Sequence, residues 1–492
     1  MFLTAVRVVT AIALARLLQA DQLGMYSLAL SAANIAVAVA IMGLDAALVR
    51  YVAVLVTRRD DEALWGTLQI GIGVPVIAGV LTGTLLYALA WPAATTLFHE
   101  PALVPLLQLV SVIVPVLTLS EALAGAIRGF KRMDQAAVAQ FVAQPLVRLA
   151  LVAVLAVGGF SPAEAIITFG LADLAASLML LRFLNRRFPL RRPWRAARRN
   201  LRDIMAFSVP VWLSDMMTKF HNNFQTLILG SLGTFTGVGI FTVASQVTMV
   251  SGQFSSSINV SAKPVVAELH ERRDMAEMGH LYRSANKWGL TVQLPVFLLM
   301  VLFPVQILSV FGESYTDGAA ALVIMAFSAL ILVGTGMGGI IIDMTGHTRL
   351  KLFNSIVRLF IFIALDVLLI PRWGVVGAAT AALVGETTVN LLRIGQVYYL
   401  FRLLPYDRDF IKPLAAAGIA LGLTLVVGRR FPPEASLFFT ALGMTTLLVS
   451  YAALLMLFGP TAEERAILAA ARRRAGLARH RARTALARAK VQ

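Results

Sequence analysis

The chain has 492 residues, of which 58% are hydrophobic and only 14% are charged. This composition excludes a soluble globular protein, which needs more polar surface, and favours a helical bundle that faces lipid. A net charge of +17 would favour nucleic-acid binding in a soluble protein, but here the basic residues lie in connectors and in the tail, so we expect no nucleic-acid partner. The sequence has no cysteine, which excludes disulfides, thiolate metal sites and cysteine nucleophiles, and no metal site is predicted.

Fourteen apolar stretches follow one another along the chain. Each is close to the roughly 20 apolar residues that a helix needs to cross a bilayer. The sequence therefore predicts an all-α polytopic membrane protein with about 14 transmembrane helices. The expected spans are 1–18, 23–49, 67–91, 103–127, 135–157, 161–184, 204–230, 238–260, 288–311, 318–343, 351–370, 374–400, 411–428 and 436–459.

The basic residues are divided unequally between the two ends of these spans. Alternate connectors with the span ends that adjoin them, together with the tail, carry 34 of the 43 Lys and Arg residues, whereas the opposite connectors carry only Arg372, Arg429 and Arg430. Connectors rich in Lys and Arg stay on the cytoplasmic side of a membrane. We therefore expect a multi-pass protein of the inner (plasma) membrane with both termini in the cytoplasm. No cleavable signal is expected, because Met1 opens directly into an apolar run.

An internal repeat relates the first six spans to the next six. Residues 23–29 match residues 238–244 at an offset of 215, and residues 147–149 match residues 357–359 at an offset of 210. Each copy has an even number of spans, so both copies have the same orientation and the pseudo-twofold axis runs along the membrane normal. Such parallel halves form two bundles around a central cleft that holds substrate, which suggests a transporter.

The repeat predicts the domain organisation. Two six-helix lobes are followed by an added helix pair that has no counterpart in the repeat, and then by a tail rich in Ala and Arg. The expected parts are an N-terminal lobe at 1–184, a basic cytoplasmic connector at 185–203, a C-terminal lobe at 204–402, a helix pair at 403–460 and a basic cytoplasmic tail at 461–492.

Several local patterns resemble a known family. Residues 15–18, 24–29 and 43–51 resemble the opening of the polysaccharide and oligosaccharide-lipid flippases of the multidrug/oligosaccharidyl-lipid/polysaccharide (MOP) exporter superfamily. Residues 370–380 are similar to that family's junction between its eleventh and twelfth spans, and residues 227–230 to the end of its seventh span. The resemblance covers essentially residues 1–460.

This resemblance implies two six-helix lobes and the transfer of an undecaprenyl-pyrophosphate-linked glycan from the cytoplasmic to the outer leaflet. Many relatives carry an acidic residue just before the Leu-Gly ending of the seventh span, where this chain has Gln225. We therefore assign no ion-coupling role to that position. Independently of the family, Pro371 and Gly374 predict a very short connector and an antiparallel hairpin of the spans 351–370 and 374–400.

Charged residues inside the spans are the best candidates for functional residues, because each costs about 2.5–3.5 kcal/mol to insert and so faces a partner or a wet cavity. Arg148 and Asp173 in the first copy correspond to Arg358 and Glu386 in the second. We expect one ion pair within each lobe. Such a pair either fixes helix packing or takes part in transport.

A polar stripe runs along the stretch 204–230. Asp215, Lys219 and Asn222 stand at i, i+4 and i+7, so they share one face of a helix. The equivalent first span carries Arg7 and Arg16. We expect these cations to offer positive potential to a pyrophosphate, with Asp215 tuning Lys219 or binding a coupling cation. Alternatively, Arg7 and Arg16 extend to lipid headgroups at the two ends of the span.

Three sets of candidate residues follow. The predicted substrate-binding residues are Arg7, Arg16, Lys219, Asn222, Arg148 and Arg358. The predicted ion-coupling residues or members of structural pairs are Asp215, Asp173 and Glu386. Asp45 and Arg50 are predicted to form a gate or a structural pair.

The predicted function is that of a flippase, not an enzyme. It moves a polyprenyl-pyrophosphate-linked oligosaccharide by alternating access, for surface polysaccharide biosynthesis. No cofactor is expected, and Na⁺ or H⁺ is the candidate coupling ion. The expected partners are the lipid-linked glycan, the bilayer and glycan assembly enzymes. Three alternatives stay open: a drug or cation exporter of the same superfamily, a lipid II flippase for peptidoglycan, and a membrane glycan polymerase or ligase, which the short outer connectors disfavour.

Overall fold

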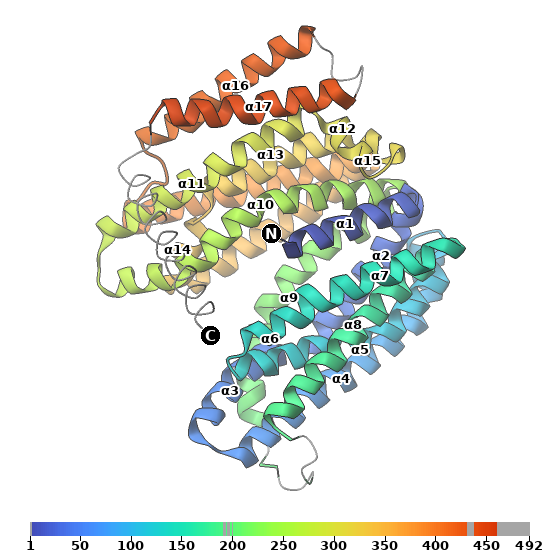
Figure 1. The fold of residues 1–492 in the computed structure, drawn as a ribbon. Helices are drawn as coiled ribbons and strands as arrows, with labels where there is room; N and C mark the ends of the chain where they lie inside the picture. Colours follow the sequence, from blue (N-terminus) through green and yellow to red (C-terminus); the bar gives the residue numbers. More distant parts are fainter. Residues whose placement is uncertain (1, 190–192, 194–196, 199, 431–436, 460–492) are drawn as a thin grey trace, which may run out of the picture. The chain divides into compact units, whose positions relative to one another are not determined.

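The structure is a computed structural model that describes residues 2–189, 193, 197–198, 200–430 and 437–459. Every regular element among these residues is a helix, and this part of the chain contains no strand (Figure 1). Apolar helices that satisfy their own backbone hydrogen bonds are what a lipid environment requires. The predicted all-α fold class is therefore confirmed.

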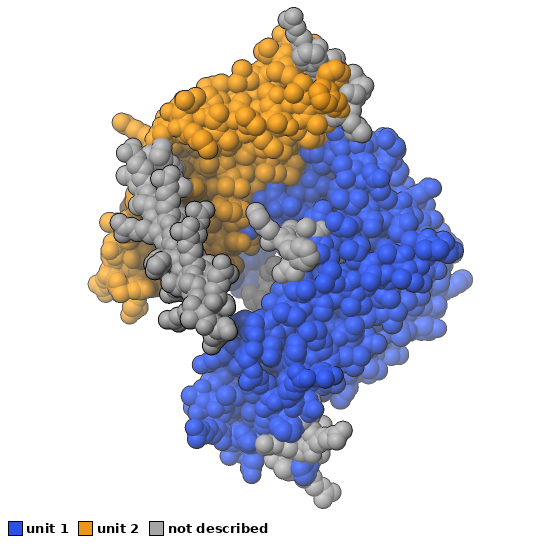
Figure 2. Space-filling view, viewed as in Figure 1, with its two compact units in different colours: residues 1–253, 304–332, 346–393 blue, residues 254–303, 333–345, 394–492 orange. Residues whose placement is uncertain are grey.

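The chain divides into two compact units, which are coloured separately in Figure 2. The first unit comprises residues 1–253, 304–332 and 346–393, and the second comprises residues 254–303, 333–345 and 394–492. The predicted lobe boundaries at residues 184 and 402 stay a prediction.

The helices of the first unit are mostly long and apolar. They are α1 (Phe2–Leu17), α2 (Ala20–Ile41), α3 (Leu44–Arg58), α4 (Asp61–Pro92), α5 (Leu103–Gly129), α6 (Met133–Ala137), α7 (Gln144–Leu155), α8 (Pro162–Arg187), α9 (Leu201–Leu232) and α12 (Pro304–Ser309), with short π or 3₁₀ turns at Ala93–Leu97, Val138–Ala143, Ala156–Gly158 and Glu313–Gly318.

Among its described residues, the second unit contains four α-helices of its own. These are α11 (Met275–Leu302), α14 (Gly338–Met344), α16 (Ile411–Arg430) and α17 (Leu437–Leu457), with a 3₁₀ turn at Arg408–Phe410. Three further helices run from one unit into the other: α10 (Phe235–Glu271), α13 (Ala319–Thr335) and α15 (Thr348–Phe401).

Eleven helical stretches in the described part of the chain are long and apolar enough to cross a membrane. The predicted count of 14 is therefore not confirmed. One reason is that α15, with 54 residues, contains two predicted spans as one helical element interrupted at Gly374 (φ 51°, ψ −125°). Beyond this break the two arms lie close together, because a Cβ atom at Gly377 would stand 2.4 Å from the carbonyl oxygen of Leu369. This is the hairpin that Pro371 and Gly374 predict.

The predicted span 23–49 is wrong at its C-terminal end. Helix α2 ends at Ile41 and α3 begins at Leu44, because Met42 (φ 49°) and Gly43 (φ 69°) both adopt left-handed backbone conformations. A Cβ atom at position 43 would lie 2.5 Å from the backbone oxygen of Ser208 in α9. The turn therefore needs glycine both for its φ angle and for the close approach of α9.

The connector that precedes α9 packs back onto α4. The indole Nε1 of Trp65 donates to the carbonyl of Pro193 (3.2 Å), and the ring of Trp65 lies 6.0 Å from that of Phe188. Arg198 forms an ion pair with Asp60 near the start of α4. These contacts hold the beginning of α9 beside the helices of the first copy.

Candidate functional site

Helix α9 carries the predicted polar stripe. Asn200 caps it by accepting a hydrogen bond from the backbone N–H of Asp203, and it continues without interruption to Leu232. The side chains of Asp215, Lys219 and Asn222 lie outside the described residues, although their backbone is part of the helix. Their predicted roles therefore stay predictions.

The described side chains of α9 attach it to α2. The indole Nε1 of Trp212 donates to the carbonyl of Ala38 (2.7 Å), and Nδ2 of Asn34 donates to Oδ1 of Asn223 (3.4 Å). These two contacts lie three helical turns, about 16 Å, apart along α9, so α9 lies against α2 over about half of the hydrocarbon thickness of a bilayer. The stripe is thus carried by a helix that the first copy holds in place.

The two arginines of α1 have different surroundings. Arg7 is exposed, and its guanidinium lies 5.7 Å from the ring centroid of Phe141. Arg16, also exposed, donates from Nε to the carbonyl of Val310, just after α12 (2.8 Å). In this conformation Arg16 therefore ties the end of α1 to the second copy. Whether either residue binds substrate stays a prediction.

Arg50 and Asp45 do not behave as the expected ion pair. The guanidinium of Arg50 lies over the ring of Phe207 in α9 (4.5 Å) and beside that of Tyr51 (5.7 Å). Asp45 stands in the first turn of α3, where its backbone packs against Gly125 of α5. Positions five residues apart point to different sides of a helix, and the described residues show no ion pair between these two. The contacts indicate that Arg50 anchors α3 to α9.

The pair predicted for the first copy is also wrong. Arg148 of α7 donates to the hydroxyl of Tyr26, and its guanidinium lies 5.0 Å from the ring centroid of Phe169 in α8. Asp173, one turn further along α8, makes no ion pair with Arg148 among the described residues, and its Oδ2 is buried without a hydrogen-bond partner. Sequence symmetry could not reveal this difference, because Tyr26, the partner of Arg148, belongs to another helix, α2.

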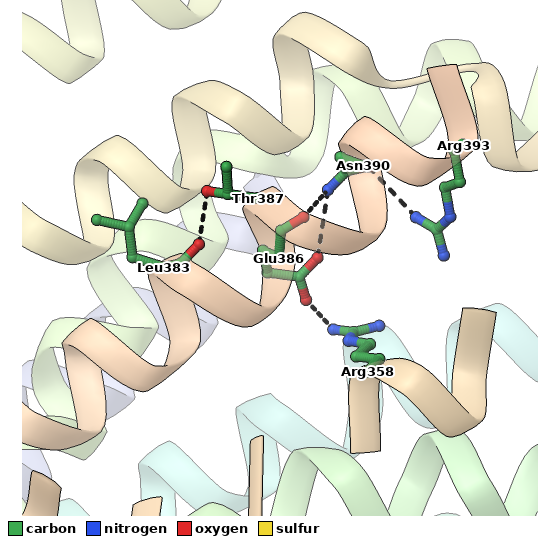
Figure 3. A network of polar contacts seen from close by, with 6 residues as sticks. All are labelled: Arg358, Leu383, Glu386, Thr387, Asn390 and Arg393. Atoms are coloured by element: carbon green, nitrogen blue, oxygen red, sulfur yellow. Dashed lines mark hydrogen bonds and ion pairs between the residues drawn. The ribbon is translucent and has the colours of Figure 1, made fainter. Parts of the chain in front are cut away.

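The pair predicted for the second copy is confirmed (Figure 3). Arg358 forms an ion pair with Oε1 of Glu386, and the side chain of Glu386 is only 10% exposed. Nδ2 of Asn390 donates to the backbone oxygen of Glu386 (2.8 Å), and Nη1 of Arg393 donates to Oδ1 of Asn390 (3.4 Å). The network joins both arms of α15. Its roles in substrate binding and ion coupling stay predictions.

A second buried polar contact escaped the sequence reasoning. Nε2 of Gln225 donates to Oδ1 of Asp366 (3.2 Å) and to the carbonyl of Ala378 (2.8 Å). Asp366 is 1% exposed and Gln225 is 8% exposed. The sequence contains two signs of this site. One is Asp366, a single carboxyl group in an apolar run, and the other is Gln225, which replaces the acidic residue that many relatives carry at its position. The structure joins these two positions.

The two copies of the repeat cross at two equivalent glycines. A Cβ atom on Gly24 of α2 would stand 1.8 Å from the carbonyl oxygen of Phe235, and one on Gly239 of α10 would stand 1.9 Å from that of Ala20. The offset of 215 residues relates Gly24 to Gly239, and it also relates Ala20 to Phe235. The contact is therefore self-complementary, as a twofold axis between α2 and α10 requires.

A second pair of equivalent contacts surrounds this crossing. The hydroxyl of Tyr315 donates to the carbonyls of Ala15 and Leu18, each at 3.0 Å. Phe98, which precedes Tyr315 by 217 residues, lies beside Gly230, which follows Ala15 by 215. All these residues belong to the first unit and lie near the connectors that are poor in Lys and Arg. At that end of the helices the two copies are held together by aromatic side chains and close backbone contacts.

Family models identify both halves of this arrangement. A model described as "Polysaccharide biosynthesis protein" matches residues 2–270, which is more than half of the chain. A second model, MatE, matches residues 210–368. The two matches overlap at residues 210–270, which hold most of α9 and nearly all of α10, where the second copy of the repeat begins.

Two of the similar curated proteins have names that refer to polysaccharide or glycan biosynthesis. A capsular polysaccharide biosynthesis protein, CapF, of Staphylococcus aureus is 23% identical over 41% of this chain and 50% of its own length. A probable low-salt glycan biosynthesis flippase of Haloferax volcanii is 21% identical over 51% of this chain and 55% of its own length. Stage V sporulation protein B of Bacillus subtilis is 22% identical over 79% of each chain. The chain spans about half the length of the first curated relatives it matches.

Solved structures share the fold. The lipid II flippase MurJ, in an inward closed conformation, has a TM-score of 0.75 at 11% identity over 93% of this chain and 97% of its own. An inward-facing multidrug resistance MATE family transporter has a TM-score of 0.69 at 18% identity over 81% of this chain and 94% of its own. The repeat, the helical fold and the match over residues 2–270 together make this chain a multi-pass membrane protein of the polysaccharide biosynthesis protein family, within the MOP exporter superfamily.

Proposed function

We propose that this protein flips a polyprenyl-pyrophosphate-linked oligosaccharide from the cytoplasmic to the outer leaflet by alternating access, for surface polysaccharide biosynthesis. It acts as a secondary-type transporter rather than an enzyme. The membrane is the inner (plasma) membrane, with both termini in the cytoplasm, as the distribution of Lys and Arg favours.

The observation that carries the proposal is the self-complementary crossing of Gly24 and Gly239. In transporters built from parallel repeats, the two bundles rock about an axis between them. The contacts of Gly24, Gly239 and Tyr315 hold the two copies together at one end of the helices. They support a transport cycle in which one state is closed at this end. With the proposed topology that end faces outward, so this state receives substrate from the cytoplasmic side.

The physical task is to take a charged, hydroxyl-rich headgroup across hydrocarbon. Each polar group that crosses without a partner costs several kcal/mol, so spontaneous flipping is slow. A hydrated, cationic path removes much of that cost while the prenyl tail stays in lipid. Because the membrane potential is negative inside, it favours outward movement of an anionic headgroup by about 2.3 kcal/mol per charge per 100 mV.

The cations within the spans are the groups that we propose for the headgroup. Arg7 at one end of α1 and Lys219 within α9 bind the pyrophosphate, since an arginine fork donates two parallel hydrogen bonds to phosphate oxygens. Arg148 and Arg358 stand deeper in each copy, where Tyr26 and Glu386 hold them. Arg16 becomes free for substrate only when its hydrogen bond to Val310 breaks.

The MatE match over residues 210–368 supports a second candidate, the export of a drug or another organic cation. The two functions differ in the charge that their binding sites must favour, because a pyrophosphate needs cations and a drug cation needs carboxylates. The arginines at positions 7, 16, 148 and 358 favour the anionic substrate. The substrate of a lipid II flippase also has an anionic headgroup. It differs from the proposed substrate only in its glycan.

The decisive experiment is reconstitution of the full chain in liposomes that carry fluorescent lipid-linked oligosaccharides in one leaflet. Protection of the fluorophore from an impermeant quencher measures flipping. We expect protein-dependent flipping of a polyprenyl-pyrophosphate glycan, and none of a cationic dye. Transport of the dye without flipping would reject the proposal in favour of the drug exporter. Lys219→Met should reduce flipping, and Lys263→Met, outside the proposed path, serves as its control.

A further inference from the structure

Helix α3 of the first copy meets α9, the first helix of the second copy, at the end of the helices that is rich in Lys and Arg. The hydroxyl of Tyr51 donates to the backbone oxygen of Asp203 (3.1 Å), and the ring of Tyr51 lies edge-on to that of Phe207, with centroids 6.0 Å apart. Both rings also pack against a buried apolar cluster, which consists of Leu44, Ala47, Ile70 and Ile204. The junction of α3 and α9 is therefore built around these two rings.

Arg50 lies at this junction without a counter-ion. It is exposed, and its guanidinium lies over the ring of Phe207, 4.5 Å from the centroid. Among the described residues it makes no hydrogen bond and no ion pair. The carboxylate of Asp203, on the facing helix, accepts from Nδ2 of Asn200 instead. The charge of Arg50 is therefore balanced by no acidic side chain here.

The ring contact leaves the hydrogen-bond donors of Arg50 available. A cation over an aromatic ring interacts with the face of the ring. The five N–H donors of arginine lie in the plane of the guanidinium, and they form a fork that matches two oxygens of a phosphate. Phe207 thus helps to fix the position of the guanidinium, while its fork stays open to a ligand.

The surroundings of Arg50 combine basic and apolar side chains, as a lipid headgroup site requires. Arg202, near the start of α9, is also exposed and forms no ion pair among the described residues. Val54 on α3 is an exposed apolar residue, as are Val209 and Leu213 on α9. Because α9 begins at residue 201, Leu213 lies about 16 Å deeper along the helix than Arg202. Apolar surface for an acyl chain therefore continues inward from the two cations.

We propose that Arg50 binds the phosphate of an anionic phospholipid, such as phosphatidylglycerol, in the leaflet at this end of the helices. Two phosphate oxygens accept hydrogen bonds from the guanidinium fork, and Arg202 adds positive potential. With the proposed topology this is the cytoplasmic leaflet, whose anionic lipids attract such cations. A lipid that contacts both helices stabilises the junction of α3 and α9. The lipid is bound and not transported, so this inference does not depend on the proposed function.

Native mass spectrometry of the purified, delipidated full chain in detergent tests the site. Phosphatidylglycerol is titrated in, and its binding is compared with that of phosphatidylcholine carrying the same acyl chains. We expect selective binding of phosphatidylglycerol, with an affinity that Arg50→Met lowers at least about tenfold, because two charged hydrogen bonds are lost. Arg59→Met removes an exposed cation just after α3 and should change the affinity less than about twofold. Equal affinity in Arg50→Met and the parent overturns the proposal.

The variant Phe207→Leu distinguishes an oriented site from general attraction between charges. It keeps an apolar side chain and every charge, but it removes the ring beneath the guanidinium. We expect the affinity for phosphatidylglycerol to fall about two- to fivefold, the size of an exposed cation–π contact. Phe360→Leu, at an exposed ring on α15, should bind like the parent. Unchanged binding by Phe207→Leu shows that charge alone attracts the lipid and overturns the oriented site. This variant also carries the test if Arg50→Met fails to fold.

Competition separates a phospholipid from other sources of phosphate. Bound phosphatidylglycerol that neither inorganic pyrophosphate nor a polyprenyl pyrophosphate displaces supports the proposal. Displacement by either compound at equimolar concentration assigns the site to a free phosphate or to the lipid-linked substrate, and it overturns the assignment to a phospholipid. Phosphatidylglycerol should also raise the unfolding temperature of the parent but not of Arg50→Met, since a ligand that binds the folded state stabilises it. No glycan is present, so these results are independent of flipping.

Discussion

Gly24 and Gly239, 215 residues apart in the sequence, occupy equivalent positions in the two copies and approach each other so closely that neither could carry a side chain. A Cβ atom built on Gly24 lies 3.1 Å from the backbone N of Gly239 and 1.8 Å from the oxygen of Phe235. Small residues permit such backbone contacts between membrane helices, where packing rather than hydrophobicity drives association. The crossing is thus a close contact between the two copies. Because it has no room for a side chain, even an added methyl group should separate the copies there.

Replacing Gly24 with alanine should open this crossing, because the added methyl group would overlap the backbone of α10. Since the chain has no cysteine, a single reporter at Leu18, which is 1% exposed, can measure the change. We expect the thiol of Leu18→Cys to react with a polar maleimide at least about tenfold faster in Gly24→Ala, a change of about 1.4 kcal/mol in the opening equilibrium. Gly73→Ala on α4, where a Cβ meets nothing within 4 Å, should leave the rate unchanged. Equal rates in all three proteins would contradict the closed contact.

Tyr315 should contribute to the same closure through its hydroxyl alone. Tyr315→Phe keeps the ring but leaves the carbonyls of Ala15 and Leu18 without a donor, which costs about 1–3 kcal/mol. We expect a lower unfolding temperature in detergent and faster labelling of the Leu18→Cys reporter. Tyr87→Phe, at a 51% exposed position, is the control. If both variants melt like the parent, the hydroxyl does not stabilise this end.

The pair of Arg358 and Glu386 should be structural as well as electrostatic. Glu386→Gln leaves the guanidinium without its counter-charge, and breaking a buried pair costs about 3–5 kcal/mol. We expect the lower end of this range, because the Arg358 side chain is 28% exposed. The double variant Arg358→Met with Glu386→Leu should recover most of the stability, since it removes both charges together.

Flipping by that double variant separates packing from transport. Restored stability with lost flipping would assign the pair a role with substrate or ion, as the sequence predicts for both residues. Restored stability with full flipping would show that the pair only fixes the packing of α15. Equal destabilisation of the single and double variants would contradict the ion-pair account itself.

Gln225 should be required because it satisfies a buried carboxyl group. Gln225→Leu leaves Asp366 and the carbonyl of Ala378 without this donor in a site that is almost fully buried. We expect a loss of about 1–3 kcal/mol, seen as a lower unfolding temperature. Gln225→Glu tests the charge: two neighbouring carboxylates should make stability fall as pH rises and the second proton leaves. A stability independent of pH in Gln225→Glu would show that these groups do not interact.

Periodic and local features of the sequence predicted the fold well. The length of the apolar stretches predicted the helices, and Pro371 and Gly374 predicted the hairpin within α15. The break at Met42 and Gly43 was missed, because an apolar run continues through it and the reason for the turn lies in α9, at Ser208. The repeat offset was read from the sequence, but the meeting of its equivalent glycines required coordinates.

The candidate site was predicted only where a partner lies in the adjacent span. Glu386 pairs with Arg358 because both lie on α15, in neighbouring arms. Asp173 and Arg148 have the same sequence relationship but do not pair, because Arg148 donates to Tyr26 on α2 instead. Which neighbouring helix a polar side chain contacts depends on the packing angles between the helices. The periodicity of the sequence does not encode these angles.

The central claim is that the two copies move relative to each other during flipping. Measuring flipping by a protein whose copies can be cross-linked tests this claim most directly. Arg16 and Val310 are exposed and joined by a 2.8 Å hydrogen bond, so a short bifunctional thiol reagent should link Arg16→Cys to Val310→Cys in a chain with no other cysteine. In liposomes carrying a fluorescent polyprenyl-pyrophosphate oligosaccharide, we predict that the cleavable cross-link stops flipping and that reductant restores it, while each single cysteine variant still flips after treatment. Undiminished flipping by the fully cross-linked protein would contradict alternating access between the two copies.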